Sequence, residues 1–294
     1  MWKKVNVVFR LKSPLHIGYL PFKGSVVSPT RYYVPGRNLW GAITKRATEH
    51  ICENPTADDY KNIGKEVIKN FRFSYFYLYD GRTIYFPRYT DEGLKYGDIT
   101  KTEFEHKFIA SFISTEINSG GTAKDKSLHE IEFINNRFRD EKGDLKGVKI
   151  AGFIWVEEDT KIDGEGIVLN DKGIVIKDFN VIKELILGGE SKYGFGHVIL
   201  DSIKIIDGKT KTVEVKINKD ITLISHLRYD KDIKFEGDME LSTGRGYFYP
   251  DIENSQDHPG AVIDEPKYFL TPGSIILDEI ETEMLWDGTL SKKH

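Results

Sequence analysis

The stretch 187-LGGESKYGFGHV-198 constrains the fold most, because its four glycines interrupt two regions of regular structure. Before it, 178-DFNVIKELIL-187 carries apolar residues at helical spacing, and Asn180 is a suitable N-cap. After it, 197-HVILDSIKII-206 is rich in β-branched residues and partly alternating, as in a strand. The sequence therefore predicts a helix, a glycine-rich loop and a strand, in that order.

Glycine-rich loops have two common uses. Glycines permit positive φ and let another backbone come close, which suits a polyanion lying across the loop. The order helix, glycines, strand is the reverse of a dinucleotide-binding fingerprint, so that function is excluded. The alternative is a helix C-cap followed by a tight turn.

Size and composition describe an ordinary globular protein. The chain has 294 residues, 39% of them hydrophobic and 30% charged, which allows one large or two small domains. It has no apolar run long enough to span a membrane and no apolar N-terminal segment of signal-peptide length. The single cysteine, Cys52, excludes an intrachain disulfide and a cysteine-rich zinc site. We therefore expect a cytoplasmic protein.

Charge is unevenly distributed along the chain. Residues 1–150 carry a net charge of +7 and residues 151–294 carry −11. A basic half and an acidic half indicate two surfaces, one for a polyanion and one for a basic neighbour, unless the partition arose by chance.

The first 52 residues predict a strand, a loop and a helix. Residues 4-KVNVVFRL-11 alternate as a strand does, and an apolar residue recurs every fourth position from Leu39 to Ile51. The helix would begin near Gly36 and Arg37, with Lys45 further along it. A helix N-terminus beside a glycine and basic side chains is suited to anion binding, although an ordinary strand-to-helix turn fits the same residues.

The stretch 71-FRFSYFYLYDGRTIYFPRY-89 predicts two strands joined at Asp80-Gly81. If the first strand is regular, five aromatic residues share one of its faces: Phe71, Phe73, Tyr75, Tyr77 and Tyr79. Such a face can stack nucleic-acid bases, but it more often packs in a core.

The remaining elements complete a recognisable order. Residues 90–147 are mostly polar and look like an insertion, and 148-VKIAGFIWVEE-158 is a strand followed by a turn at Asp163-Gly164. Without the insertion, the order is strand, helix, hairpin, strand, helix, glycine loop, strand. This predicts an α+β, ferredoxin-like fold of the RNA-recognition type over residues 1–206. Residues 207–294 form an extended C-terminal part, which a second, degenerate ferredoxin-like unit would explain.

Four stretches in this order resemble the RAMP superfamily of CRISPR effector subunits, particularly those of type III complexes. They are 13-SPLHIG-18, 34-VPGRNLWGAI-43, 122-TAKDKSLHEIEF-133 and 188-GGESKYGFGHV-198. The tail stretch 272-PGSIIL-277 looks like that of subunits that cap the 5′ handle of the guide RNA. The resemblance covers residues 4–205 well and the tail weakly.

The resemblance implies an RNA-binding subunit within a guide-RNA ribonucleoprotein, with the guide RNA, target RNA and other effector subunits as partners and with no cofactor. By this likeness, RNA contacts are expected from the first helix's N-terminal region and from the glycine loop. The candidate residues are Gly36, Arg37, Lys45, Gly188, Gly189, Lys192, Tyr193, Gly194, Gly196 and His197.

The composition of one loop favours a non-catalytic scaffold over a nuclease. Family members that cut target RNA carry an aspartate in the loop after the first strand, whereas Tyr19–Tyr33 contains no Asp or Glu. Phosphodiester cleavage needs a metal-binding carboxylate or a general base. His16 is the candidate base if the chain instead resembles the guide-processing endoribonucleases, although a histidine between Leu15 and Ile17 is more often a packed residue. The histidine spacing predicts no metal site.

Overall fold

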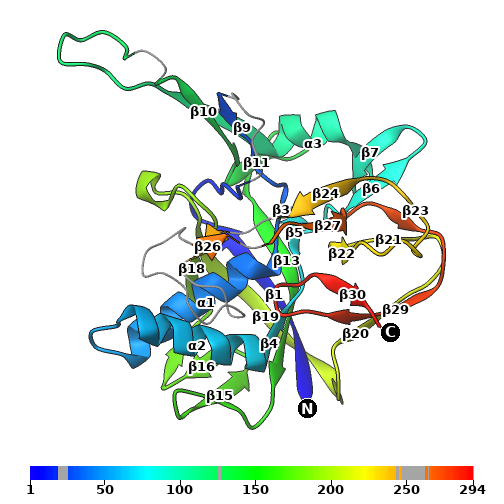
Figure 1. Ribbon diagram of the computed structural model, residues 1–294. Coiled ribbons are helices and arrows are strands. Elements are labelled where there is room, and N and C mark those ends of the chain that lie inside the picture. The colour runs from blue at the N-terminus through cyan, green and yellow to red at the C-terminus, as the bar shows by residue number, and fades with distance from the viewer. Residues whose placement is uncertain (19–25, 125–126, 243–244, 247–261, 264, 294) are drawn as a thin grey trace.

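The computed structural model of the protein describes residues 1–18, 26–124, 127–242, 245–246, 262–263 and 265–293. Within these residues the chain is an α+β protein with few helices and many strands (Figure 1). The helices are α1 (Gly36–Ile51), α2 (Ala57–Asn70) and α3 (Lys101–Phe108). Thr56 and Asp59 form a capping box on α2, and Thr100 and Glu103 form one on α3.

The central sheet has the strand order β18-β19-β1-β13-β5-β3, and β4 also pairs with β13. In chain order its strands are β1 (Trp2–Leu11), β3 (Tyr33–Val34), β4 (Phe71–Phe73), β5 (Phe76–Tyr79), β13 (Lys149–Glu157), β18 (Glu184–Ile186) and β19 (His197–Thr210). The long strand β1 is antiparallel to both of its neighbours, β13 and β19. The predicted strands at 4–11, 148–158 and 197–206 are therefore confirmed.

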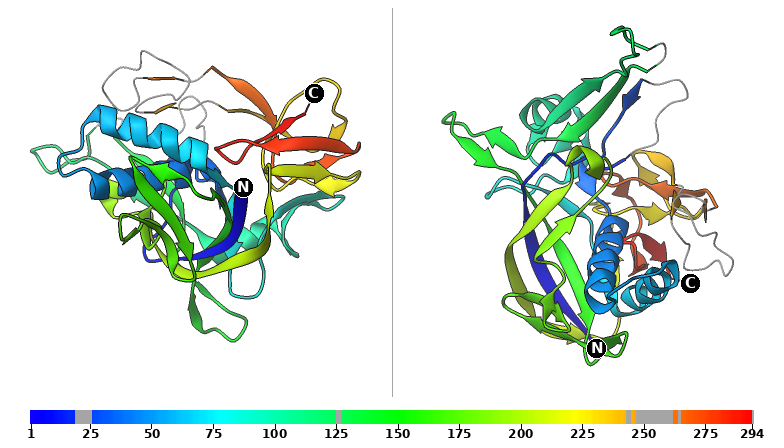
Figure 2. Two further views of the ribbon diagram at one scale, coloured as in Figure 1. Left: turned by 90° about the horizontal axis from the view of Figure 1, so that it is seen from below. Right: turned by 90° about the vertical axis from the view of Figure 1, so that its left-hand side faces the viewer.

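Helices α1 and α2 cover one face of this curved sheet (Figure 2). Val5, Val7 and Phe9 of β1 point into the core that lies beneath the helices. The predicted stripe on α1 is confirmed, because Leu39, Ile43 and Ala47 are buried and Ile51 packs against the same core. Burial of such side chains contributes roughly 1.5–3 kcal/mol each for the larger ones.

The helix predicted over 178–187 is wrong. The chain instead forms β17 (Phe179–Asn180) and β18. Leu185 and Leu187 are buried and Ile186 between them is 44% exposed, so the apolar residues here follow the two-residue period of a strand. The Asn180 side chain accepts a hydrogen bond from the Ile182 N–H and donates one to the Lys172 carbonyl, which fixes a turn rather than a helix N-terminus.

A small sheet takes the place of the second expected helix. It has the order β14-β15-β16-β17, with β14 (Lys161–Ile162), β15 (Glu165–Asn170) and β16 (Gly173–Ile176). The predicted turn at Asp163-Gly164 joins β14 to β15, and both residues have positive φ.

The aromatic stretch also differs from the prediction. Its alternation breaks at Ser74, between β4 and β5, so the aromatic residues do not share one face. Phe71 and Phe73 join the main core, whereas Tyr75 and Tyr77 pack with Tyr33 in a separate cluster. These aromatic residues are buried and serve as core.

The insertion forms two larger strand groups around α3 and one short strand pair, β11–β12. One group contains β6 (Pro87–Thr90), β7 (Gly93–Tyr96) and β8 (Ile99–Thr100). The other contains a long hairpin of β9 (Ile109–Ser114) and β10 (His129–Ile134), which pairs with β2 (Val27–Ser28) and projects from the body in Figure 1. The strands β11 (Arg137–Arg139) and β12 (Leu145–Gly147) lead back to β13.

The described residues beyond β19 form strands without a helix. One sheet has the order β20-β29-β30-β22-β27-β24 and another the order β21-β28-β23. Their strands, with the pair β25–β26, are β20 (Glu214–Ile217), β21 (Ile221–Thr222), β22 (Leu227–Arg228), β23 (Phe235–Glu236), β24 (Met239–Ser242), β25 (Arg245–Gly246), β26 (Val262–Ile263), β27 (Lys267–Leu270), β28 (Ile275–Ile276), β29 (Ile280–Met284) and β30 (Leu290–Lys292). This part has its own core, to which Trp2 and Trp155 of the central sheet contribute. The division at residue 206 stays a prediction.

Candidate nucleic-acid interface

The glycine-rich loop joins two adjacent antiparallel strands, β18 and β19. The Leu187 N–H donates to the Gly196 carbonyl at 2.9 Å, which closes the base of the loop. At its tip, Ser191–Tyr193 form a single 3₁₀ turn. Glu190 and Gly194, on either side of this turn, both adopt left-handed backbone conformations. The loop is thus an ordered hairpin connection.

The loop packs directly against the stretch 13-SPLHIG-18. The Gly196 N–H donates to the Pro14 carbonyl at 2.7 Å, and the Gly189 N–H donates to the His16 carbonyl at 2.9 Å. The His197 N–H donates to Ser13 Oγ at 3.0 Å. Two stretches that were singled out separately in the sequence therefore form one structural unit.

Two of the loop glycines are required by the protein's own backbone. A Cβ on Gly188 would lie 2.1 Å from the His16 carbonyl oxygen, and one on Gly196 would lie 2.1 Å from the Leu187 carbonyl oxygen. Both residues also have positive φ, +76° and +84°. By contrast, a Cβ on Gly194 would meet no atom within 4 Å. Close approach at Gly188 and Gly196 thus serves internal packing, while Gly194 lies open on the exterior.

The tip of the loop presents a cation beside an aromatic ring. Lys192 is exposed and makes no ion pair with the described residues, and Tyr193 is 58% exposed. A cation can contact a phosphate and an exposed ring can stack on a base, so the pair is suited to single-stranded nucleic acid.

His197, at the start of β19, is already engaged. Its Nε2 lies 2.6 Å from Glu184 Oε1 across the hairpin. The His197 ring thus faces Glu184 of β18 at the base of the loop, and it is only partly exposed.

His16 lies beneath the loop and is 4% exposed. Its Nδ1 is 2.7 Å from the carbonyl oxygen of Glu132 on β10, so the ring also contacts the insertion. In this position His16 is a packed residue between the glycine loop and the insertion.

The N-terminal region of α1 is covered by the C-terminal part of the chain. A Cβ on Gly36 would lie 2.6 Å from the Asp287 carbonyl oxygen, so Gly36 allows that segment to pack closely. The Arg37 guanidinium lies 6.0 Å from the ring centre of Trp286. Lys45 is exposed and lies 3.7 Å from Glu49 one turn later. Helix α1 also packs against β18, which carries the glycine loop.

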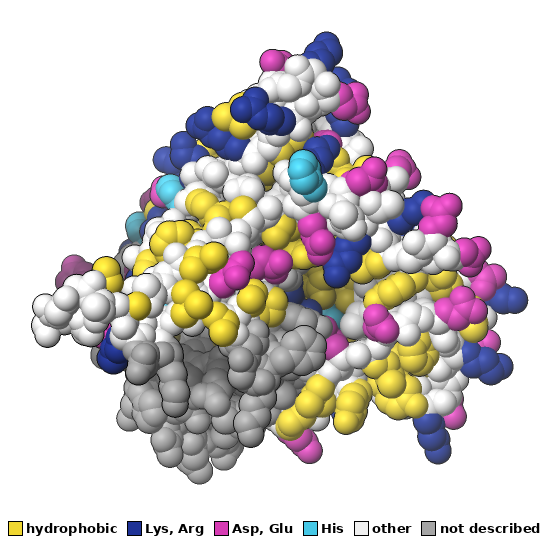
Figure 3. All heavy atoms as spheres, turned by 90° about the horizontal axis from the view of Figure 1, so that it is seen from above, with side chains coloured by type: hydrophobic (Ala, Val, Ile, Leu, Met, Phe, Trp, Pro, Cys, Tyr) yellow, Lys and Arg dark blue, Asp and Glu magenta, His cyan; other side chains and the backbone are white. Residues whose placement is uncertain are grey.

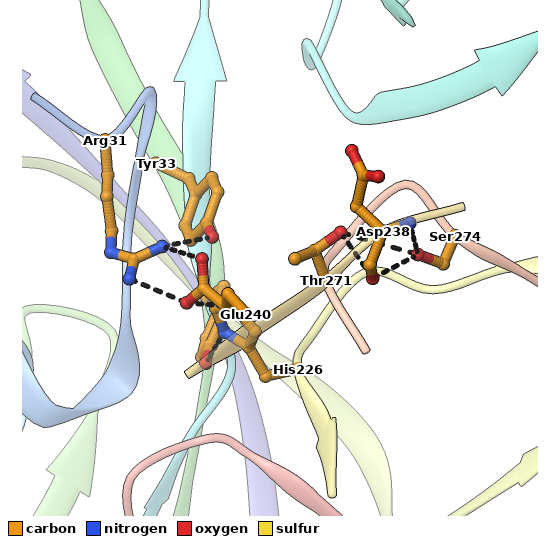
Figure 4. Close-up of polar contacts among 8 residues, drawn as sticks. Arg31, Tyr33, His226, Asp238, Glu240, Thr271 and Ser274 are labelled. Atoms are coloured by element: carbon orange, nitrogen blue, oxygen red, sulfur yellow. Dashed lines mark hydrogen bonds and ion pairs between the residues drawn. The ribbon is translucent and has the colours of Figure 1, made fainter. Parts of the chain in front are cut away.

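A buried polar cluster that the sequence did not predict joins the central sheet to the C-terminal part (Figure 4). Arg31 binds both carboxylate oxygens of Glu240, at 2.7 and 3.1 Å. His226 Nε2 lies 2.8 Å from Glu240 Oε1, and His226 Nδ1 lies 2.6 Å from the hydroxyl of Tyr75. Burial alone would raise the pKa of Glu240, but the hydrogen bonds from His226 and Arg31 lower it to about 2.

The buried cluster has a defined protonation pattern. Burial lowers the pKa of His226, so the ring is neutral. A neutral ring can accept at Nδ1 from the Tyr75 hydroxyl, while its Nε2 faces the Glu240 carboxylate. The cluster therefore fixes how the C-terminal sheet packs on the core.

The described residues contain no group of three or more histidine, cysteine, aspartate or glutamate side chains arranged to hold a metal ion. None of the helices in that part of the chain has the length and apolar character needed to cross a membrane.

No protein-family model and no curated protein matches the sequence. Among solved structures, the chain is similar to one in the type III-B Cmr-beta structure bound to cognate target RNA, with a TM-score of 0.48 and 12% identity, covering 92% of this chain and 86% of the other. A second structure of Cmr-beta, bound to cognate target RNA and AMPPnP, gives a TM-score of 0.49 at 12% identity, with coverage of 92% and 85%. A CRISPR protein from Archaeoglobus fulgidus gives 0.42 at 10% identity, with coverage of 99% and 98%.

Proposed function

We propose that this protein is a non-catalytic, guide-RNA-binding subunit of a type III CRISPR ribonucleoprotein and that it caps the 5′ handle of the guide. The observation that carries the proposal is the docking of the glycine loop on residues 13–18, which leaves Lys192 and Tyr193 exposed at its tip. Both stretches are among the four that resemble the RAMP superfamily.

The strand order supports a ferredoxin-like core in this proposal. Taken as first to fourth strands, β1, β5, β13 and β19 lie side by side in the order 4-1-3-2, with antiparallel neighbours. This is the order expected of a ferredoxin-like sheet, although strands replace its second helix. The RNA would cross the glycine loop, with contacts from the loop residues Gly188, Gly189, Lys192, Tyr193, Gly194 and His197 and from Arg37 and Lys45 of α1. Gly36 and Gly196 are buried, so they would shape the backbone beneath the RNA without contacting it.

The burial of His16 supports a scaffold role over that of a nuclease. A general base must come within hydrogen-bond reach of the group it deprotonates. His16 is 4% exposed and its Nδ1 is already bonded to the insertion, so a scissile phosphate would need the glycine loop to move first. The loop Tyr19–Tyr33, which lacks acidic residues, lies partly outside the described residues.

The proposal is tested by expressing the chain with the products of its neighbouring genes, purifying it by a tag and sequencing the bound RNA. We expect discrete guides derived from repeats, in a large complex. An RNA-free monomer would contradict the proposal and would leave the glycine loop as a structural turn.

The same complex tests the catalytic alternatives, a target-cutting backbone subunit and a guide-processing endoribonuclease that uses His16. Guide lengths and cleavage of a matched target are compared for wild type, His16→Ala and the exposed control His106→Ala. We expect all three complexes to behave alike. Loss of guide processing or of target cleavage in His16→Ala alone would assign catalysis to this residue.

A further inference from the structure

A cavity of about 490 Å³ lies between the insertion and the C-terminal sheet, and none of its described lining residues belongs to the glycine loop. Its walls come from residues 29–33, from β6, β7 and α3 of the insertion, and from β24 and the turn at Thr271-Pro272. Its volume is within the range of ligand-binding cavities, roughly 300–1,000 Å³. Four tyrosines line it, Tyr32, Tyr33, Tyr89 and Tyr96.

The charges around this cavity are unbalanced. Arg31 is bound to Glu240, and Lys101 lies 3.5 Å from Glu105. The two further carboxylates, Glu132 and Asp238, pair with no cation among the described residues. The described residues of the lining therefore carry a surplus of two negative charges.

Both surplus carboxylates are held in place by neutral donors. Glu132 Oε2 accepts from the Thr30 N–H at 2.8 Å, and Asp238 Oδ2 accepts from the Tyr89 hydroxyl. The backbone of Asp238 is fixed by Thr271 and Ser274, while its carboxylate points away from both of them (Figure 4). Each of these two positioned carboxylates on the cavity wall can form an ion pair with a basic side chain that enters the cavity.

An exposed apolar strip begins at the cavity wall. Met239 lines the cavity and is 49% exposed, and Leu241, two residues further along β24, lies on the same face. Tyr268 stands opposite Leu241 on β27 and is 59% exposed. Tyr229, directly after β22, is 41% exposed and donates its N–H to the Tyr268 carbonyl at 2.9 Å, which extends the strip beyond β27. Hydrophobic and acidic side chains also adjoin one another on the upper surface of the molecule (Figure 3).

We propose that the cavity and strip bind a partner protein that places one arginine or lysine side chain in the cavity and packs apolar side chains on the strip. The composition fits a protein interface, because methionine and tyrosine are enriched at interface cores and a buried basic anchor often dominates the affinity. Charge complementarity decides against RNA here, since its phosphates would meet Glu132 and Asp238. This surface is separate from the glycine loop, so the inference does not rest on the RNA-binding proposal.

The test measures binding of the full chain to a capped pentapeptide of sequence LARAL and to the same peptide with citrulline, which is neutral and nearly isosteric, in place of arginine. We expect the arginine peptide to bind wild type at least tenfold more tightly. Glu132→Gln combined with Asp238→Asn should remove this preference, while Tyr268→Ala should weaken both peptides equally. The matched control, Asp171→Asn with Asp207→Asn, removes two exposed carboxylates elsewhere and should leave the preference unchanged.

Equal affinity for the two peptides, or no binding of either, would overturn the proposal. So would a ten-nucleotide oligouridylate that competes with the arginine peptide in wild type, since it would assign the cavity to nucleic acid. Melting curves of each variant establish that it is folded. Replacing Lys192 should leave peptide binding unchanged. Failure of this inference would therefore appear in the peptide assay, whereas failure of the RNA-binding proposal would appear in the RNA assay.

Discussion

The backbone N–H of Gly196 donates to the carbonyl of Pro14 at 2.7 Å and thereby fastens the glycine-rich loop to the segment that follows the first strand. Only a residue without a side chain fits there, because the Gly196 φ is +84° and a Cβ would lie 2.1 Å from the Leu187 carbonyl. The glycine pattern of this loop therefore divides into positions that the fold needs and positions left open to a ligand.

Replacing Gly196 tests this division. Gly196→Ala should lower the free energy of unfolding by more than about 2 kcal/mol, because it adds a backbone clash to the strain of a positive φ. Gly194→Ala introduces the same kind of backbone strain, because Gly194 has a φ of +81°, but its Cβ would meet no atom within 4 Å. The free energy of unfolding should therefore fall by only about 1 kcal/mol in this variant. Chemical denaturation measures both. Equal losses in the two variants would show that the close contact at Gly196 is not needed.

The parts of the fold that the sequence predicted are those in which local pattern and burial coincide. The stripe on α1 and the turn at Asp163-Gly164 were both identified, because a helix buries one face and a two-residue hairpin favours positive φ. The structure of segment 178–187 was not predicted correctly, because Val181, Ile182 and Leu185 fit a helical period as well as they fit a turn followed by a strand. Only the pairing of β18 with β19 decides between them.

The candidate site was predicted in part. The sequence identified the glycine loop and 13-SPLHIG-18, but it did not show that the two stretches touch. Likewise, nothing in the sequence around Glu240 marks it as buried. The ion pair with Arg31 exists only because the C-terminal sheet folds back over β3 and β5. Such long-range pairs have no local signal.

Lys192 and Tyr193 are expected to contact RNA without supporting the fold. Lys192→Ala should weaken binding of single-stranded RNA and reduce the magnitude of the salt slope by about one, since one phosphate contact is lost. Tyr193→Ala should cost about 1–3 kcal/mol of affinity through lost stacking. Binding is measured by fluorescence anisotropy over a salt series. Lys172→Ala, in the turn between β15 and β16, is the matched control; a slope change as large there as at Lys192 would contradict the assignment.

Glu240 should make the stability of the protein depend on pH under acidic conditions. Its folded-state pKa of about 2 lies below the ordinary value of 4.5, so its full contribution is present above pH 4.5 and is lost as the pH falls towards 2. The difference of about 2.5 units corresponds to roughly 3 kcal/mol. The stability advantage of wild type over Glu240→Gln should therefore shrink by that order between pH 5 and pH 2, as measured by urea denaturation. An advantage that is constant over this range would mean that Glu240 is not held ionised by Arg31 and His226.

Tyr75 offers the most specific test of the buried cluster, because its hydroxyl is hydrogen-bonded to His226 Nδ1 at 2.6 Å. Tyr75→Phe keeps the ring that stacks on Tyr33 but leaves a buried ring nitrogen without its partner. We expect a loss of about 1–3 kcal/mol in unfolding free energy. Tyr79→Phe is the control, since the Tyr79 hydroxyl bonds an exposed carbonyl at Gly81 that water can satisfy instead. If both variants are equally stable, His226 does not depend on Tyr75 for its orientation. If only Tyr75→Phe is destabilised, the hydrogen bond helps to hold the C-terminal sheet against the core.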